Sequence, residues 1–166
     1  MVFISIAVIL RLFPHPANIS PIAGMALLGG AYFNKRYALF APLIALFISD
    51  MFLGFHQSMF AVYSSYFLIG CIGLYISKRL TPQTIIGASL FSSVLFFLVT
   101  NFNFWYIHSL YPKTLEGILE SYRMALPFFR NTLIGDLLYT GLFFGLYIGV
   151  RRLFFRPLIV LQKEGM

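Results

Sequence analysis

Apolar runs alternate with short polar connections along the whole chain. The runs cover Val2–Phe13, Pro21–Phe33, Tyr37–Leu53, Met59–Ile76, Ile85–Tyr106 and Met124–Val150. A membrane-spanning helix needs about 20 mostly apolar residues. The pattern therefore predicts an all-α integral membrane protein with about six transmembrane helices in one bundle. The first two runs are short, and the prolines between them also allow the two to form a single broken hairpin. The backbone groups at the break would then be hydrogen-bonded by protein or water.

One connection has a helical pattern of its own. In Thr114–Tyr122, apolar residues recur at i, i+3, i+4 and i+7 from Leu115, while Glu116 and Glu120 fall on the other face. Thr114 is a suitable N-cap. The segment predicts a short amphipathic helix on the outer surface, either as a connector or as a lid over a pocket.

Composition supports the membrane class. Hydrophobic residues make up 60% of the chain and charged residues only 10%, whereas a typical soluble domain is about a quarter charged. A soluble fold of this size could not bury so much apolar surface. We therefore expect one transmembrane domain over residues 1–166 and exclude a soluble enzyme.

The net charge of +7 is better explained by the orientation of the chain in the membrane than by binding to nucleic acid. One set of connections holds eight of the twelve basic residues: Lys35, Arg36, Lys78, Arg79, Arg151, Arg152, Arg156 and Lys163. The other set holds Arg11, Lys113, Arg123 and Arg130. The positive-inside rule then predicts an inner-membrane protein with both termini in the cytoplasm and no nucleic-acid partner.

Polar residues inside or near the spans converge on the outward half. Ionisable groups there are costly and often functional, and a converging polar set lined by aromatic rings is typical of a ligand pocket. We expect substrate binding by Arg11, His15, Asn18, Asp50, His56, Asn101, Trp105, Arg130, Asn131 and Asp136. A structural interpretation also stands, in which Arg11 and Arg130 neutralise Asp50 and Asp136 as buried pairs.

Helical rise adds detail to this site. It places Asp50 near the depth of Arg130 and Asp136 deeper, so we expect an Arg130–Asp50 contact, direct or through water or ligand, with Asp136 at the pocket floor. The arginines would hold an anionic group of the substrate. Phe102, Trp105 and Phe128 would stack on a flat ring.

Two further features leave alternatives open. Cys71 lies deep in the fourth run, as a buried apolar group or, as an outside chance, a ligand for a metal-containing substrate. Gly141, Gly145 and Gly149 form a ridge for packing within the bundle or against a partner subunit.

The chain contains no nucleotide-binding glycine loop, serine nucleophile elbow or HExxH motif. We therefore expect no cofactor and no enzymatic activity. Two alternatives remain, a membrane enzyme with Asp136 or a histidine as general base, and a membrane scaffold or assembly subunit.

Several motifs together resemble a family of uncharacterised small bacterial membrane proteins. They are Arg11-Leu-Phe-Pro-His-Pro-Ala-Asn18, the stretch from Ser49 to His56 (SDxxLGFH), and the stretch from Pro127 to Asp136 (PFFRNTxxGD). The resemblance covers most of the chain.

In size, span number and outward site, the chain is also similar to the S components of energy-coupling-factor vitamin transporters. That resemblance implies uptake of a vitamin-like micronutrient and a transmembrane coupling subunit with ATPases. The Ala-xxx-Ala pattern of those proteins is missing from the first run, and Ala26-xxx-Gly30 is its nearest substitute.

Overall fold

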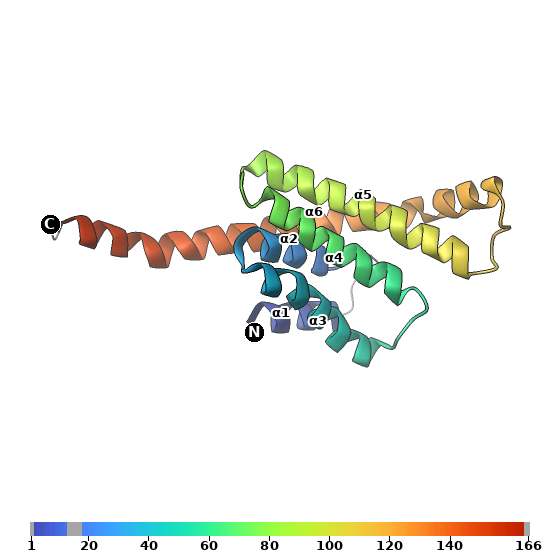
Figure 1. The fold of residues 1–166 in the computed structure, drawn as a ribbon, viewed down its shortest axis with the longest axis horizontal. Coiled ribbons are helices and arrows are strands. Elements are labelled where there is room, and N and C mark those ends of the chain that lie inside the picture. The colour runs from blue at the N-terminus through green and yellow to red at the C-terminus, as the bar shows by residue number, and fades with distance from the viewer. Residues whose placement is uncertain (1, 13–17, 165–166) are drawn as a thin grey trace.

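Six helices form nearly all of this computed structural model, which describes residues 2–12 and 18–164 (Figure 1). They are α1 (Val2–Leu12), α2 (Ile22–Tyr32), α3 (Lys35–Leu53), α4 (Met59–Ile76), α5 (Pro82–Ile107) and α6 (Leu115–Glu164). Within the described residues there is no strand, which confirms the all-helical fold predicted from the apolar runs.

The short helix α2 lies at the centre of the bundle. Its residues from Ile22 to Ala31 are all buried, and it contacts every other helix. A helix that is apolar on all faces is stable only inside a protein or a membrane. Its sequence, IAGMALLGGAY, has this character, so burial follows from its composition.

Glycines bring the backbones of α2 and its neighbours together. A Cβ atom built on Gly30 would stand 2.3 Å from the carbonyl oxygen of Gly70, and one on Gly73 would stand 2.5 Å from that of Leu27. On the other side of α2, a Cβ on Gly24 would stand 2.8 Å from the amide nitrogen of Thr140. These positions therefore admit only glycine. The absence of side chains there lets α2 pack closely against α4 and α6.

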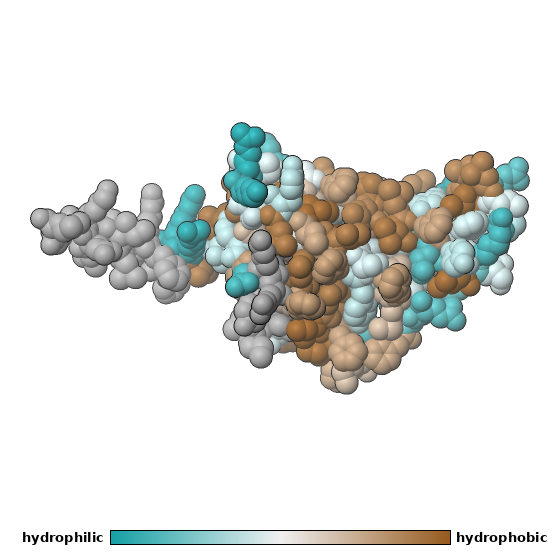
Figure 2. Space-filling view, viewed as in Figure 1, coloured by the Kyte–Doolittle hydropathy of each residue, from teal (hydrophilic) through white to brown (hydrophobic). Residues whose placement is uncertain are grey.

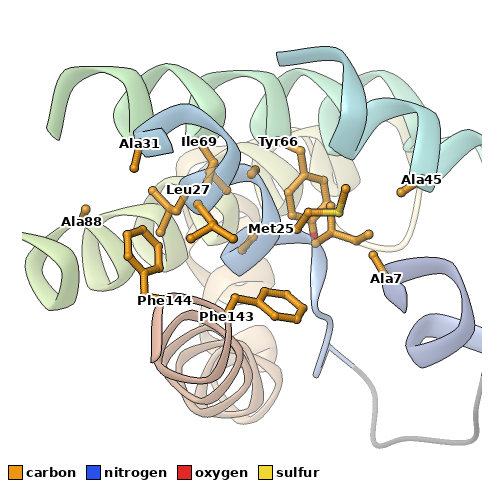
Figure 3. Close-up of a cluster of buried hydrophobic side chains, with 14 of the residues drawn as sticks. Ala7, Met25, Leu27, Ala31, Ala45, Tyr66, Ile69, Ala88, Phe143 and Phe144 are labelled. Carbon is orange, nitrogen blue, oxygen red and sulfur yellow. The ribbon is translucent and has the colours of Figure 1, made fainter. Parts of the chain in front are cut away.

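The core gathers side chains from all six helices around α2 (Figure 3). Met25 and Leu27 of α2 face Tyr66 and Ile69 of α4 and Phe144 of α6. Small residues complete the cluster where the outer helices approach, namely Ala7 of α1, Ala45 of α3 and Ala88 of α5. Ala26 and Gly30 are buried here too, so the stretch proposed as a substitute partner contact packs inside the chain.

Three helices in the described part of the chain are long and apolar enough to cross a membrane: Met59–Ile76, Pro82–Ile107 and Leu115–Leu153. The expectation of about six spans is therefore wrong by this measure. Apolar run length was a poor guide because α1 and α2 have only 11 residues each, about 16 Å of helix against a hydrocarbon core of about 30 Å. The apolar part of α3, Leu39–Leu53, is also short.

The surface is nevertheless that of an integral membrane protein. Large apolar side chains point outward along the long helices, such as Phe60 at 83% and Tyr75 at 84% exposure. Figure 2 shows an apolar band across the middle of the bundle, with hydrophilic residues toward its two ends. Soluble monomers rarely expose apolar patches of this extent.

The ribbon places the connections at two opposite ends (Figure 1). The two termini and the α4–α5 turn lie toward one end, whereas the α3–α4 and α5–α6 connections lie at the other. The predicted separate outer helix is not found, because residues 115–122 form the first part of α6. Its predicted cap is present, since the Thr114 hydroxyl accepts a hydrogen bond from the Gly117 amide at 3.2 Å.

The glycine ridge of α6 faces away from the rest of the described chain. A Cβ built on Gly141, Gly145 or Gly149 would meet nothing within 4 Å. The expectation that this ridge packs inside the bundle is therefore wrong. The spacing alone could not distinguish it from Gly24 and Gly30, which make the close contacts.

Candidate ligand-binding site

The short length of α2 leaves room inside the bundle. Its C-terminal half packs beside late residues of α4 and α6, as in the contacts of Gly30 with Gly70 and of Tyr32 with Tyr147. Beyond its N-terminus, two cavities of about 500 and 620 Å³ lie between the other helices. They share Asn18, Val62, Phe96 and Thr132 in their walls, so they adjoin.

The first, which we call the aromatic cavity, is walled mainly by α5 and α6. Its described lining consists of Asn18, Ser58, Val62, Phe96, Phe97, Thr100, Asn101, Phe104, Leu110, Tyr111, Ser121, Met124, Ala125, Phe128 and Thr132. Ser121 is 3% exposed, and its hydroxyl has no hydrogen-bond partner in the described structure. Buried hydroxyls are normally hydrogen-bonded, so the Ser121 hydroxyl is available to form a hydrogen bond with a ligand.

The second, which we call the polar cavity, lies where α1, α4 and α6 approach the segment before α2. Its described lining consists of Arg11, Leu12, Asn18, Ser20, Leu53, His56, Val62, Tyr66, Phe96, Thr132 and Asp136. Asp136 is only 3% exposed. Its Oδ2 atom accepts a hydrogen bond from the Ser93 hydroxyl at 2.7 Å.

An ion pair closes one side of the polar cavity. The Arg11 guanidinium donates to Asp50 Oδ1 at 2.7 Å and also to the Ser49 hydroxyl. The Tyr63 hydroxyl donates to the other oxygen, Oδ2, at 2.8 Å. Both oxygens of Asp50 are therefore occupied, and the network joins α1, α3 and α4.

Asn18 shapes the entry of the chain into α2. Its backbone has φ of 66°, in the left-handed region. Asparagine tolerates this conformation better than most residues that carry a side chain. The turn brings Asn18 to the boundary between the two cavities.

The structure brings five of the ten predicted site residues to the cavities. Arg11, His56 and Asp136 line the polar cavity, Asn101 lines the aromatic cavity, and Asn18 lines both. Asp50 stands behind Arg11 in the ion pair. His15 lies outside the described residues.

Arg130 does not take the predicted position. The expected direct Arg130–Asp50 contact is wrong, because Asp50 pairs with Arg11 and Arg130 is exposed. Neither Arg130 nor Asn131 is among the described residues that line the cavities. The structural interpretation of a buried arginine–aspartate pair is confirmed for Arg11 and Asp50.

Trp105 stabilises a connection instead of lining a cavity. Its Nε1 atom donates to the Pro112 carbonyl oxygen at 3.0 Å, and Lys113 Nζ lies 5.1 Å from its ring centroid. Phe102 packs against Trp105, with ring centroids 5.8 Å apart. Of the three predicted stacking rings, Phe128 lines the aromatic cavity.

No three histidine, cysteine, aspartate or glutamate side chains gather as a metal site within the described part of the chain. Cys71 is partly buried and is not among the described lining of either cavity.

Sequence reasoning missed Ser93 and Tyr63, the hydrogen-bond donors to the two buried aspartates. Both lie in long apolar helices, where a single hydroxyl does not interrupt the hydropathy pattern. One signal was present: Ser89, Ser92 and Ser93 lie at i, i+3 and i+4 on one face of α5, and all three are buried.

Comparison with known proteins gives one match. Residues 1–158 match the model of a family described as "Family of unknown function (DUF6580)". No curated protein and no solved structure matches the chain. The match agrees with the resemblance to an uncharacterised family. Because it covers almost the whole chain, including both cavities, this protein belongs to the family of unknown function DUF6580.

Proposed function

We propose that this integral membrane protein binds a small micronutrient in the two adjoining cavities and takes part in its uptake. The observation that carries the proposal is the joined interior space, walled by aromatic rings on one side and by a buried aspartate on the other. Ligand sites are typically concave, of about 300–1,000 Å³, and mostly apolar with a few polar groups. Each of the two cavities falls in that range.

The orientation of the chain supports uptake from outside. Lys78 and Arg79 belong to the α4–α5 connection, which lies toward the same end as both termini (Figure 1). The positive-inside rule favours a cytoplasmic location for that end. The cavities border the opposite end, next to Ser58 and Leu110, so they would face the outside of an inner membrane.

A coupling subunit completes the proposed mechanism. The chain has no ATP-binding motif, so the energy for uptake would come from a partner or from an ion gradient. The ridge of Gly141, Gly145 and Gly149 meets no other part of the described chain. It leaves a face on which the helices of such a subunit could approach closely.

The proposal is tested by the small molecules that the protein retains on purification. We expect native mass spectrometry of the detergent-solubilised protein to show one bound small molecule. Ala125→Phe should remove it, because this side chain would fill the aromatic cavity. Leu138→Phe is the matched control, since Leu138 lies on the same helix and is 56% exposed.

Two results would contradict uptake by binding. One is a protein that retains no small molecule from any growth medium and takes up none in reconstituted vesicles. The other is conversion of the retained molecule into a product by the purified protein, which would favour the alternative of a membrane enzyme.

A further inference from the structure

We infer that the ligand carries a positively charged nitrogen, which Asp136 binds, attached to a flat ring that lies in the aromatic cavity. The inference rests on the proposed function, because it assigns a chemical class to the ligand of the same site. It reverses the expectation of an anionic ligand held by Arg11 and Arg130.

The first step is the surroundings of Asp136. Two helices pack against α6, namely α5 and α2. Neither contains a lysine, arginine, histidine or acidic residue along its length, Pro82–Ile107 and Ile22–Tyr32. The hydrogen bond from Ser93 serves one oxygen of Asp136, Oδ2. A buried carboxylate without a cation is costly, so a cationic ligand would stabilise the ionised form of Asp136.

The second step is the other charges at the polar cavity. The charge of Arg11 is matched by Asp50 at 2.7 Å. The N-terminus of α2 lies at the same cavity next to Ser20, and a helix end contributes only about half a positive charge. His56 lines the cavity from the α3–α4 connection and is exposed, whereas His15 lies outside the described residues. Among the described side chains of this cavity, Asp136 is therefore the acidic group that has no arginine or lysine partner.

The third step is the neighbouring space. Phe96 and Val62 line both cavities, so a ligand bound to Asp136 extends directly into the aromatic cavity. There Phe97, Phe104 and Phe128 offer ring faces and edges. Pairing of aromatic rings is favourable beyond the burial of apolar area alone. This division into a carboxylate end and an aromatic end matches an aromatic amine or a heteroaromatic cation.

Three indole probes of similar shape test the charge preference: tryptamine, tryptophol and indole-3-propionate, which are cationic, neutral and anionic at pH 7. Binding to the purified full-length protein is measured by isothermal titration in a nonionic detergent, with protein-free micelles as the blank. We expect tryptamine to bind at least about tenfold more tightly than tryptophol, and indole-3-propionate to bind most weakly.

Asp136→Asn should reduce the preference for tryptamine to about onefold while keeping tryptophol binding, because it removes the charge and keeps the size. If this variant does not fold, the ranking of the three probes on the unchanged protein still decides. Equal affinities, a preference for the anion, or binding of none of the probes would overturn the inference. The proposed function is then judged separately, by the molecule that the protein retains on purification. If that molecule is anionic or neutral, the inference fails but the proposed function stands.

Discussion

Asp50 has a partner for each of its carboxylate oxygens, the Arg11 guanidinium at 2.7 Å and the Tyr63 hydroxyl at 2.8 Å. The aspartate is 1% exposed and the arginine side chain 16%. In such surroundings a charge that loses its partner cannot recover hydration. The pair therefore strengthens the packing of α1 against α3.

Arg11→Ala should lower the stability of the protein strongly. Breaking one side of a buried ion pair costs about 3–5 kcal/mol, because the remaining charge is left uncompensated. Thermal unfolding in detergent would measure the loss. The double variant with Asp50→Ala should recover part of it. Arg130→Ala is the control, since Arg130 is exposed, and an equal loss in that variant would contradict this account.

The residues of the site were only partly predictable. Arg11, Asn18, His56, Asn101 and Asp136 stood out as polar groups inside or next to apolar runs, and all five line the cavities. Arg130 stood out for the same reason, yet it is exposed. Helical rise gives the depth of a residue, but the face it presents depends on how the helix packs, which one sequence does not reveal.

At the scale of elements, helix boundaries followed hydropathy closely. The run Met59–Ile76 is α4 as predicted, and α3 and α5 begin a few residues earlier than expected. The largest error in a helix boundary was at α6, where residues 115–122 and the last run form one helix. Charged residues such as Glu120 and Arg123 interrupt an apolar pattern without interrupting a helix, because both are good helix formers.

Gly30→Ala should destabilise the protein, whereas Gly141→Ala should not. A methyl group at position 30 would stand 2.3 Å from the Gly70 carbonyl oxygen, while one at position 141 would meet nothing within 4 Å. In a helix, alanine is favoured over glycine by about 0.5–1 kcal/mol, so Gly141→Ala should be neutral or slightly stabilising. Melting temperatures of the purified variants provide the comparison, and similar melting of both would argue against the close α2–α4 contact.

The α5–α6 connection depends on Lys113. Its Nζ donates to the carbonyl oxygens of Tyr106 and His108, both at 2.8 Å, and to that of Trp105. These carbonyls end α5, where a cation also interacts favourably with the helix dipole by about 0.3–1 kcal/mol. The same connection supplies Leu110 and Tyr111 to the wall of the aromatic cavity.

Lys113→Ala should therefore loosen this wall. We expect faster amide hydrogen exchange over residues 105–113 and weaker retention of the bound molecule, with the rest of the bundle unchanged. Lys78→Ala is the matched control, because Lys78 is an exposed lysine of another connection. Exchange that stays the same in both variants would show that Lys113 does not stabilise the connection.

For the whole molecule, the central question is its orientation in the membrane. The proposed topology places the α5–α6 connection outside the cell and the α4–α5 connection in the cytoplasm. Leu110 and Lys78 are exposed representatives of these connections.

Single cysteines at these two positions, in a background with Cys71→Ala, would test the orientation in intact cells. A thiol reagent that does not cross the membrane should label Leu110→Cys and should reach Lys78→Cys only after the cells are opened. The reverse labelling pattern would mean that the cavities face the cytoplasm, and the proposed uptake from outside would fail.

The short central helix has a consequence for how the protein is made. Released from the ribosome ahead of α4, α2 has no Gly70 and Gly73 to pack against, and its length of about 16 Å is too small to cross the bilayer unaided. We therefore expect α2 to reach its final position only after later segments have been synthesised, so the helices do not pack in the order of the chain. Nascent chains halted before Met59 should leave a cysteine at Leu28 open to labelling, and chains halted beyond Ile107 should protect it.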